Sequence, residues 1–207
     1  MTSPSDSTND AYHDGSRRWQ DRFDTRRLAD RLAQRLARTA LNDDDRAFIA
    51  RQPLCFLATA DAAGQPDVSY KGGEPGFVRV LDATMLALPS YDGNGQFRSL
   101  GNIDVNARVA LLFIDFEQPQ RLRVHGRATA TPDDPLIGAW PGAQAVIRVA
   151  VELVFPNCPR YIHPTARQGI SAYVPAADGS APVAAWKRFE AFRDVLPCGD
   201  PATRDPD

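Results

Sequence analysis

Residues 90–116 read SYDGNGQFRSLGNIDVNARVALLFIDF. A glycine-rich turn (DGNG) leads into a short polar segment and then into a strongly apolar run (VALLFIDF). Glycines let the backbone bend so that its N–H groups converge, and a helix beginning near Gln96 adds free N–H groups and a positive dipole end. Arg98 offers a planar guanidinium suited to phosphate oxygens, with Ser99 and Asn102 close by. The stretch therefore predicts a phosphate cradle followed by a buried strand; the alternative is an ordinary surface turn.

Apolar runs on both sides of this stretch predict a protein built mainly from strands. Turn residues such as those of GGEPG (72–76) separate the runs. The connection over 117–120 is so short that the strands beside it are expected to be antiparallel neighbours. Long helices between strands are missing, which favours a closed or partly closed antiparallel barrel over a parallel sheet. The expected strands are 54–60, 67–71, 77–81, 84–88, 109–116, 121–131 and 145–155.

Three other polar segments are candidates for chemistry. Lys71 stands before two glycines and can either reach a phosphate or remain a solvated hairpin lysine. Arg121, Arg123 and His125 alternate with apolar residues, so their face of the strand either meets water or lines a contact between subunits. Cys158 has no His and acidic partners at recognisable positions, so we expect no nucleophilic role for its thiol.

Helical patterns occur at both ends of the chain. Arg-rich residues 17–41 carry apolar side chains at near-helical spacing and predict one amphipathic helix, while residues 183–195 predict a short C-terminal helix. Another helix is expected to begin after Asn42, a good N-cap, and to end before Pro53. The expected organisation is a disordered tail (1–16), an N-terminal helix (17–41), a barrel domain (42–165) and a C-terminal extension with one helix (166–207).

Composition narrows the class of protein. The chain has 207 residues, 43% of them hydrophobic, and a net charge of −2, so bulk electrostatic binding to nucleic acid is not expected. Three widely spaced cysteines indicate a reduced, cytoplasmic protein without a disulfide framework. The first residues have no apolar core typical of a secretory signal, and no apolar run is long enough to span a membrane. Neither a metal-binding cluster nor a hydrolase, Walker or GxGxxG motif is present.

Three segments in a fixed order carry a family resemblance: LCFLATADAAGQPDVSYKGGEPGFVRVLD, LPSYDGNGQFRSLGNIDVNARVALLFIDF and QRLRVHGRATA. In this order they resemble the pyridoxamine 5′-phosphate oxidase-related flavoproteins over roughly residues 42–162. The resemblance implies a mainly β fold, an antiparallel split β-barrel of the FMN-binding type with peripheral helices. It also implies a homodimer with FMN bound at the subunit interface.

The same resemblance implies roles for individual residues. Arg98 and Ser99 match the pair that contacts the flavin phosphate, although many members carry Lys where this chain has Ser99. Ser69 and Lys71 fall on the strand beside the ribityl chain and phosphate, and Arg121 falls on a strand that meets the flavin across the dimer. The full implied cofactor-binding set is Ser69, Lys71, Ser90, Tyr91, Asp92, Gly93, Asn94, Arg98, Ser99, Asn102, Arg121 and Arg160.

The function implied is that of an FMN-dependent oxidoreductase acting on a small molecule that the sequence does not identify. The C-terminal end, WKRFEAFRDVLPCGDPATRDPD, has nothing like the Arg-containing substrate motif of true pyridoxamine phosphate oxidases, so vitamin B6 oxidation is not expected. No catalytic acid or base can be named. The alternatives are a deazaflavin-dependent reductase, a non-catalytic flavin- or haem-binding module, and a structural protein with an empty barrel.

Overall fold

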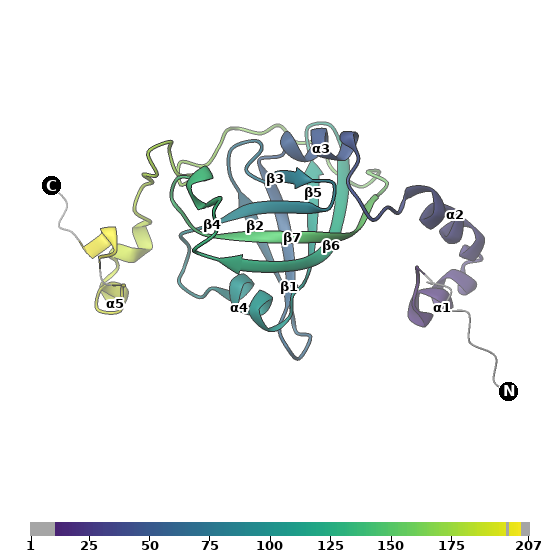
Figure 1. Cartoon of the computed structure of the whole chain (residues 1–207), viewed down its shortest axis with the longest axis horizontal. Coiled ribbons are helices and arrows are strands. Elements are labelled where there is room, and N and C mark those ends of the chain that lie inside the picture. The colour runs from purple at the N-terminus through teal and green to yellow at the C-terminus, as the bar shows by residue number, and fades with distance from the viewer. Residues whose placement is uncertain (1–10, 198, 204–207) are drawn as a thin grey trace.

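Seven antiparallel strands form the body of the protein. The computed structural model describes residues 11–197 and 199–203, so the first ten residues of the predicted tail lie outside the described part. The strands pair in the order β2-β1-β5-β6-β7-β4-β3 (Figure 1). Their bounds are β1 Leu54–Ala60, β2 Pro66–Gly72, β3 Arg79–Asp82, β4 Met85–Tyr91, β5 Arg108–Asp115, β6 Gln120–Thr131 and β7 Ala143–Pro156.

The mainly β prediction is confirmed, and each expected strand exists with ends shifted by a few residues. The sheet folds over on itself, with β1, β2 and β5 crossing behind β4, β7 and β6, as a split barrel does (Figure 1). It is open rather than closed, because within the described residues β2 and β3 are edges that pair with one neighbour each. The β5–β6 register, in which Val109 faces Gly126 and Asp115 faces Gln120, confirms the predicted antiparallel connection.

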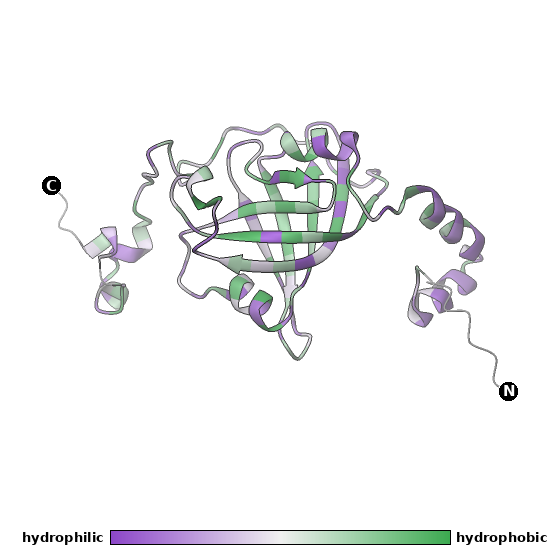
Figure 2. Ribbon diagram, viewed as in Figure 1, coloured by the Kyte–Doolittle hydropathy of each residue, from purple (hydrophilic) through white to green (hydrophobic). Residues whose placement is uncertain are grey.

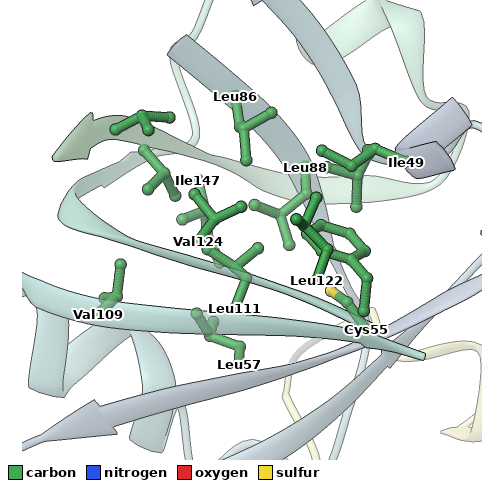
Figure 3. Packing of buried hydrophobic residues seen from close by; sticks show 14 of the residues in the cluster. Ile49, Cys55, Leu57, Leu86, Leu88, Val109, Leu111, Leu122, Val124 and Ile147 are labelled. Atoms are coloured by element: carbon green, nitrogen blue, oxygen red, sulfur yellow. The ribbon is translucent and has the colours of Figure 1, made fainter. Parts of the chain in front are cut away.

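The core lies between the two halves of the folded sheet. Leu57 and Leu111 project from the paired strands β1 and β5 toward Val124 and Leu88, as Figure 3 shows, and all four are fully buried. Ile49 closes the core from one side and has no exposed surface. Each such side chain contributes roughly 1.5–3 kcal/mol of burial free energy, so the alternating apolar pattern of the strands accounts for the fold.

Two helices cover the ends of the barrel. α3 (Asp43–Ala50) begins as predicted at Asn42, whose side chain accepts a hydrogen bond from the Asp45 N–H while the Asp45 carboxylate accepts one from the Asn42 N–H. α4 (Arg98–Val105) begins two residues after the expected start at Gln96. The delay arises because Phe97 takes a left-handed conformation, with φ of 48°, before the helix can begin.

The single N-terminal helix predicted over 17–41 is wrong in detail, because the structure has two helices, α1 (Asp14–Arg22) and α2 (Arg26–Leu36). Asp24 interrupts the helical conformation between them, because its φ of 51° is left-handed. Figure 2 shows polar and apolar residues alternating along both helices, and neither helix has a buried residue. The predicted amphipathic pattern is therefore present, but its apolar side is exposed.

The single C-terminal helix predicted over 183–195 is also corrected. A 3₁₀ helix, η2 (Ala185–Arg188), and one turn of α-helix, α5 (Glu190–Arg193), replace it because Phe189 is extended between them, with ψ of 138°. Two further 3₁₀ turns, η1 (Ile137–Ala139) and η3 (Pro201–Thr203), complete the described elements. Among the described residues, no helix is both long and apolar enough to cross a bilayer.

Candidate functional site

A cleft of about 470 Å³ lies where β2, the end of β4 and the start of α4 meet. We call it the glycine-turn cleft, because the turn over 92–95 forms part of its wall. The register of β1 and β2 places Lys71 opposite Cys55 and Ser69 opposite Leu57, so the polar side chains of β2 share the inner face of the sheet. The cleft brings together nine of the predicted site residues: Ser69, Lys71, Ser90, Tyr91, Asp92, Gly93, Asn94, Arg98 and Ser99.

The local sequence explains how the turn presents backbone N–H groups to the cleft. Gly95 has a φ of 74°, a conformation that glycine adopts without strain. The Asn94 side chain accepts a hydrogen bond from the Gln96 N–H at 3.1 Å, which stabilises the turn. No side chain of the described residues caps the first turn of α4 after Phe97, so the N–H groups there remain open to an anion.

Two cations on the cleft wall form no ion pair with any of the described residues. Within 11–197 and 199–203, the Lys71 ammonium makes no hydrogen bond or ion pair. Burial lowers its pKa, and the charge of Asp67, which also lines the cleft, partly offsets this effect. Among the described residues, the Arg98 guanidinium donates only to the Gln96 amide oxygen, at 2.8 Å. Positive groups without carboxylate partners, beside an uncapped helix end, are suited to phosphate oxygens. The observed donor set therefore fits the phosphate of a flavin mononucleotide.

Asp92 is the acidic residue of the turn, and a residue far along the chain neutralises it. The Lys187 ammonium lies 2.7 Å from Asp92 Oδ2 and 2.9 Å from Asp200 Oδ2. Burial alone disfavours the charge on Lys187, but hydrogen bonds to the two carboxylates raise its pKa. Sequence reasoning missed Lys187, because nothing in the local pattern of residues 183–195 indicates a contact with a turn 95 positions away.

Three predicted residues do not line the cleft in the single chain. The Asn102 amide donates to Thr59 Oγ1 at 3.0 Å and so ties α4 to β1. Arg121 lies on β6 opposite Ile114 of β5, away from the inner face. The Arg160 guanidinium lies over the Tyr161 ring, 5.8 Å from its centre.

The polar row predicted on β6 lies on the outer face of the sheet. Arg123 and His125 pair with Leu112 and Ala110 of β5, whose side chains point outward. For both, burial is the main cause of a lowered pKa, and a neighbouring arginine adds to the effect. Arg123 also donates a hydrogen bond to the Asn157 side chain, which fixes the start of the Asn157–Arg160 loop.

The described residues hold no group of three or more His, Cys, Asp or Glu side chains that could bind a metal ion. The cleft is lined by uncapped backbone N–H groups, cations, hydroxyl groups and two tyrosines, Tyr70 and Tyr91, which together suit an anion. Ser90 and Ser99 are both buried at its base. Such a site can hold a phosphorylated cofactor and leave an aromatic wall for its ring.

Comparison with solved structures finds proteins of similar fold. A putative pyridoxamine 5′-phosphate oxidase from Lactobacillus delbrueckii is 26% identical, with 57% of this chain and 95% of that one covered and a TM-score of 0.47. HupZ from Group A Streptococcus is 22% identical, with coverage of 61% and 99% and a TM-score of 0.47. The heme storage protein HutZ from Vibrio cholerae is 21% identical, with coverage of 56% and 93% and a TM-score of 0.38.

No curated protein matches the chain. The family model described as pyridoxamine 5′-phosphate oxidase matches residues 41–158, in agreement with the resemblance of the three sequence segments. Because that match spans more than half of the 207 residues, the chain belongs to the pyridoxamine 5′-phosphate oxidase family.

Proposed function

We propose that this protein binds FMN in the glycine-turn cleft and uses it as an oxidoreductase acting on a small molecule. The observation that carries the proposal is the pair of cations, Lys71 and Arg98, which face the cleft beside the uncapped start of α4 and form no ion pair within the part of the chain that the structure describes. Family membership supports the same assignment. When bound, a flavin supplies hydride or electron transfer, and the protein supplies binding, orientation and electrostatics.

The residues of the cleft divide into two proposed roles. Lys71, Arg98 and the N–H groups of the turn bind the phosphate, and the buried hydroxyls of Ser90 and Ser99 donate or accept along the ribityl chain. Tyr91 lies at the other side of the turn and provides a ring wall. None of these groups needs to move a proton at the substrate, so the proposal names no acid or base.

We further propose a homodimer in which the outer face of β2, β1 and β5 is the interface. Val68 and Tyr70 on this face are 66% and 61% exposed, and Phe56 and Leu112 continue the apolar surface across the neighbouring strands. Exposed apolar patches of this kind mark protein contacts. In such a dimer Arg121, at the edge of the same face, would approach the flavin of the second copy and stabilise negative charge on its ring.

Cofactor binding is tested with the purified full chain stripped of any bound ligand. We expect FMN to bind with quenching of its fluorescence and riboflavin to bind more weakly, because the cleft recognises the phosphate. Lys71→Ala and Arg98→Ala should each weaken FMN binding roughly tenfold to a hundredfold, whereas Arg27→Ala, an exposed arginine on α2, should have no effect. Equal affinity of the three variants and the wild type would contradict the proposal.

The same apo protein distinguishes the alternatives. Thermal shifts measured with FMN, FAD, a deazaflavin and haem rank the cofactors by affinity. A larger shift with the deazaflavin than with FMN would replace FMN in the proposal, and tight flavin binding without turnover by NADH or NADPH would favour a non-catalytic module. If the wild type binds none of these cofactors, the alternative of a structural protein with an empty barrel would be favoured.

The proposed interface is tested by the same substitution at two exposed valines, one inside the interface and one outside it. Val68→Glu places a charge on the proposed contact, whereas Val105→Glu places one on α4, where the valine is 61% exposed. We expect the wild type and the Val105 variant to sediment as dimers and the Val68 variant to sediment as a monomer. A monomeric wild type would exclude the interface.

A further inference from the structure

A second cavity of about 270 Å³ adjoins the glycine-turn cleft. Tyr70, Gly72 and Tyr91 line both spaces, so the two open onto the same wall of the barrel. Tyr173 and Arg167 come from the C-terminal extension and line the second space but not the glycine-turn cleft. Arg167 also lines a separate cavity beside Glu117. We call this space the tyrosine cavity, after Tyr70, Tyr91 and Tyr173.

The C-terminal extension forms the outer wall of the tyrosine cavity and is held in place at several points. The Thr165 N–H donates to the Phe116 carbonyl at 2.9 Å, and the Arg167 N–H donates to Glu117 Oε1 at 3.0 Å. Further along, Gly142 packs so closely on Pro175 that a Cβ on this glycine would lie 2.8 Å from the proline ring. In Figure 1 the light-green coil after β7 crosses over the barrel toward the yellow C-terminal part.

The lining of the tyrosine cavity is both aromatic and rich in hydrogen-bond donors. In the part of the chain that the structure describes, the hydroxyl groups of Tyr70, Tyr91 and Tyr173 make no hydrogen bond, although Tyr91 is half-buried. The Arg167 guanidinium lies 3.8 Å from Glu117 Oε2, at the long limit of an ion pair, so much of its donor capacity is free. Rings that present free hydroxyl donors beside a cation match a flat ligand with an oxygen anion.

We propose that the tyrosine cavity is the substrate subsite and that it takes a flat aromatic acid. The ring would lie among the three tyrosines, and the acid oxygens would accept hydrogen bonds from their hydroxyls and from Arg167. Because Tyr70 also lies on the proposed dimer face, the subsite would border the interface in the dimer. The subsite rests on the proposed function, because it gains its meaning as a substrate site from the flavin in the adjoining cleft. It adds to that function the class of substrate and the residues that select it.

The size of the cavity agrees with this class. Ligand sites bury most of a small molecule in a space of about 300–1,000 Å³ lined by apolar and aromatic side chains with a few polar groups. The tyrosine cavity, at about 270 Å³, lies just below this range, which suits a small ligand of one or two fused rings. Leu54 and Ile170 add apolar surface to its wall.

The test uses equilibrium binding to the full chain without flavin, so it does not depend on turnover. The probe is 2-naphthoate, and its matched control is decahydro-2-naphthoate, which has the same carbon skeleton and charge without the aromatic rings. We expect calorimetry to show binding of 2-naphthoate at least tenfold tighter than binding of the saturated acid. Equal binding of the two acids, or no binding of 2-naphthoate, would overturn the proposal.

Variants of Tyr173 locate the site, because Tyr173 lines the tyrosine cavity but not the glycine-turn cleft. Tyr173→Ala should weaken 2-naphthoate at least tenfold, and Tyr173→Phe, which removes only the hydroxyl, should weaken it by a smaller factor. Tyr161→Ala is the control, because Tyr161 is 84% exposed and lines neither space. Unchanged affinity in Tyr173→Ala would show that the acid binds elsewhere.

Failure of this proposal can be told apart from failure of the proposed function. The dissociation constant for FMN should be the same in Tyr173→Ala, Tyr161→Ala and the wild type. If FMN binds and the aromatic acid does not, only the subsite is wrong. If the acid binds as expected and FMN does not, the cavity is a ligand site but the flavin function is wrong.

Discussion

The Lys187 ammonium forms an ion pair of 2.7 Å with the Asp92 carboxylate, although 95 positions separate the two residues in the chain. The contact joins the C-terminal extension to the turn of the candidate phosphate site. The Lys187 side chain is only 9% exposed, so the pair is shielded from water and salt on one side. Asp92 also accepts a hydrogen bond from the Gln144 side chain at 3.3 Å, which restricts its orientation.

Lys187→Met is expected to weaken FMN more than riboflavin. The substitution leaves the Asp92 carboxylate without its cation beside the proposed phosphate position, and like charges then repel. We expect the FMN dissociation constant to rise about tenfold and that of riboflavin to change less than about twofold, measured by flavin fluorescence. Adding Asp92→Asn to the variant should restore most of the FMN affinity, and an equal loss for both flavins would point to a purely structural role.

Arg148→Gln is expected to remove a stabilisation that depends on pH. Arg148 donates two hydrogen bonds to the buried Asp134 carboxylate, which lowers the pKa of Asp134. A lowered carboxyl pKa stabilises the folded state above the unfolded value of about 3.9 and ceases to do so as the pH falls through the folded value. The melting temperature of the variant should therefore lie below that of the wild type at pH 7, and the difference should shrink below about pH 4.

The exposed neighbour Asp133 provides the control for this pair. Asp133→Asn should change the melting temperature little, and by a similar amount at each pH. A difference between wild type and Arg148→Gln that stays constant from neutral to acid pH would exclude the ion pair as its source.

Gly126→Ala is expected to destabilise the barrel. Gly126 stands at the irregularity between β6 and β7, where a Cβ would lie 2.1 Å from the Ala150 carbonyl oxygen. Relief of that clash requires a backbone shift, which should lower the free energy of unfolding by about 1–3 kcal/mol or more. Urea titration measures this change. Gly101→Ala should raise that free energy by about 0.5–1 kcal/mol, because Gly101 lies inside α4 with open space around it.

The opposite signs of the two glycine changes make the comparison decisive. If Gly126→Ala yields no folded protein, the gain from Gly101→Ala still tests whether the backbone around Gly101 is as described. Equal stability of Gly126→Ala and the wild type would contradict the β6–β7 register.

Cys158 is expected to react with iodoacetamide in the folded protein, and Cys55 is not. Cys158 is exposed, and its pKa is lowered by a hydrogen bond from the Arg160 N–H and by the charges of Arg160 and Arg121. Burial raises the pKa of Cys55 to about 12. Peptide mapping by mass spectrometry should find the label at Cys158, with Cys55 labelled only after unfolding.

The dependence of this labelling on pH tests the cause. Because the thiolate reacts, the rate at Cys158 should rise at lower pH than for an ordinary thiol, and Arg160→Gln should move the rise toward higher pH. Labelling of Cys55 at the same rate as Cys158 in the folded state would contradict the buried position of Cys55.

Much of the barrel could be predicted from local patterns. The alternation of Leu122 and Val124 with Arg121 and Arg123 reflects which side chains face the core, and the structure confirms that alternation. The N-cap at Asn42 was predictable for the same reason, since its hydrogen bonds involve residues within one turn. Local patterns failed at Asp24 and Phe189, where a single residue leaves the helical conformation and divides a predicted helix.

The candidate site was predictable in part. The cluster of nine residues around the glycine turn followed from the family resemblance, and its members come from segments with recognisable motifs. Arg121 and Arg160 do not line the cleft of their own chain. The role proposed for Arg121 requires a second copy, and the cofactor contact implied for Arg160 stays a prediction. Lys187 and Tyr173 escaped prediction because their surroundings are built by segments far away in the sequence.

Residue order alone was sufficient to establish the mainly β architecture, the antiparallel neighbours β5 and β6, and the family, because hydropathy alternation and short turns act over a few residues. The path of the C-terminal extension, and with it the Lys187–Asp92 pair and the tyrosine cavity, emerged only in three dimensions. Contacts between distant segments depend on how the whole barrel packs. That the edge strands β2 and β3 do not pair with each other to close the barrel also depends on that packing, and not on either strand alone.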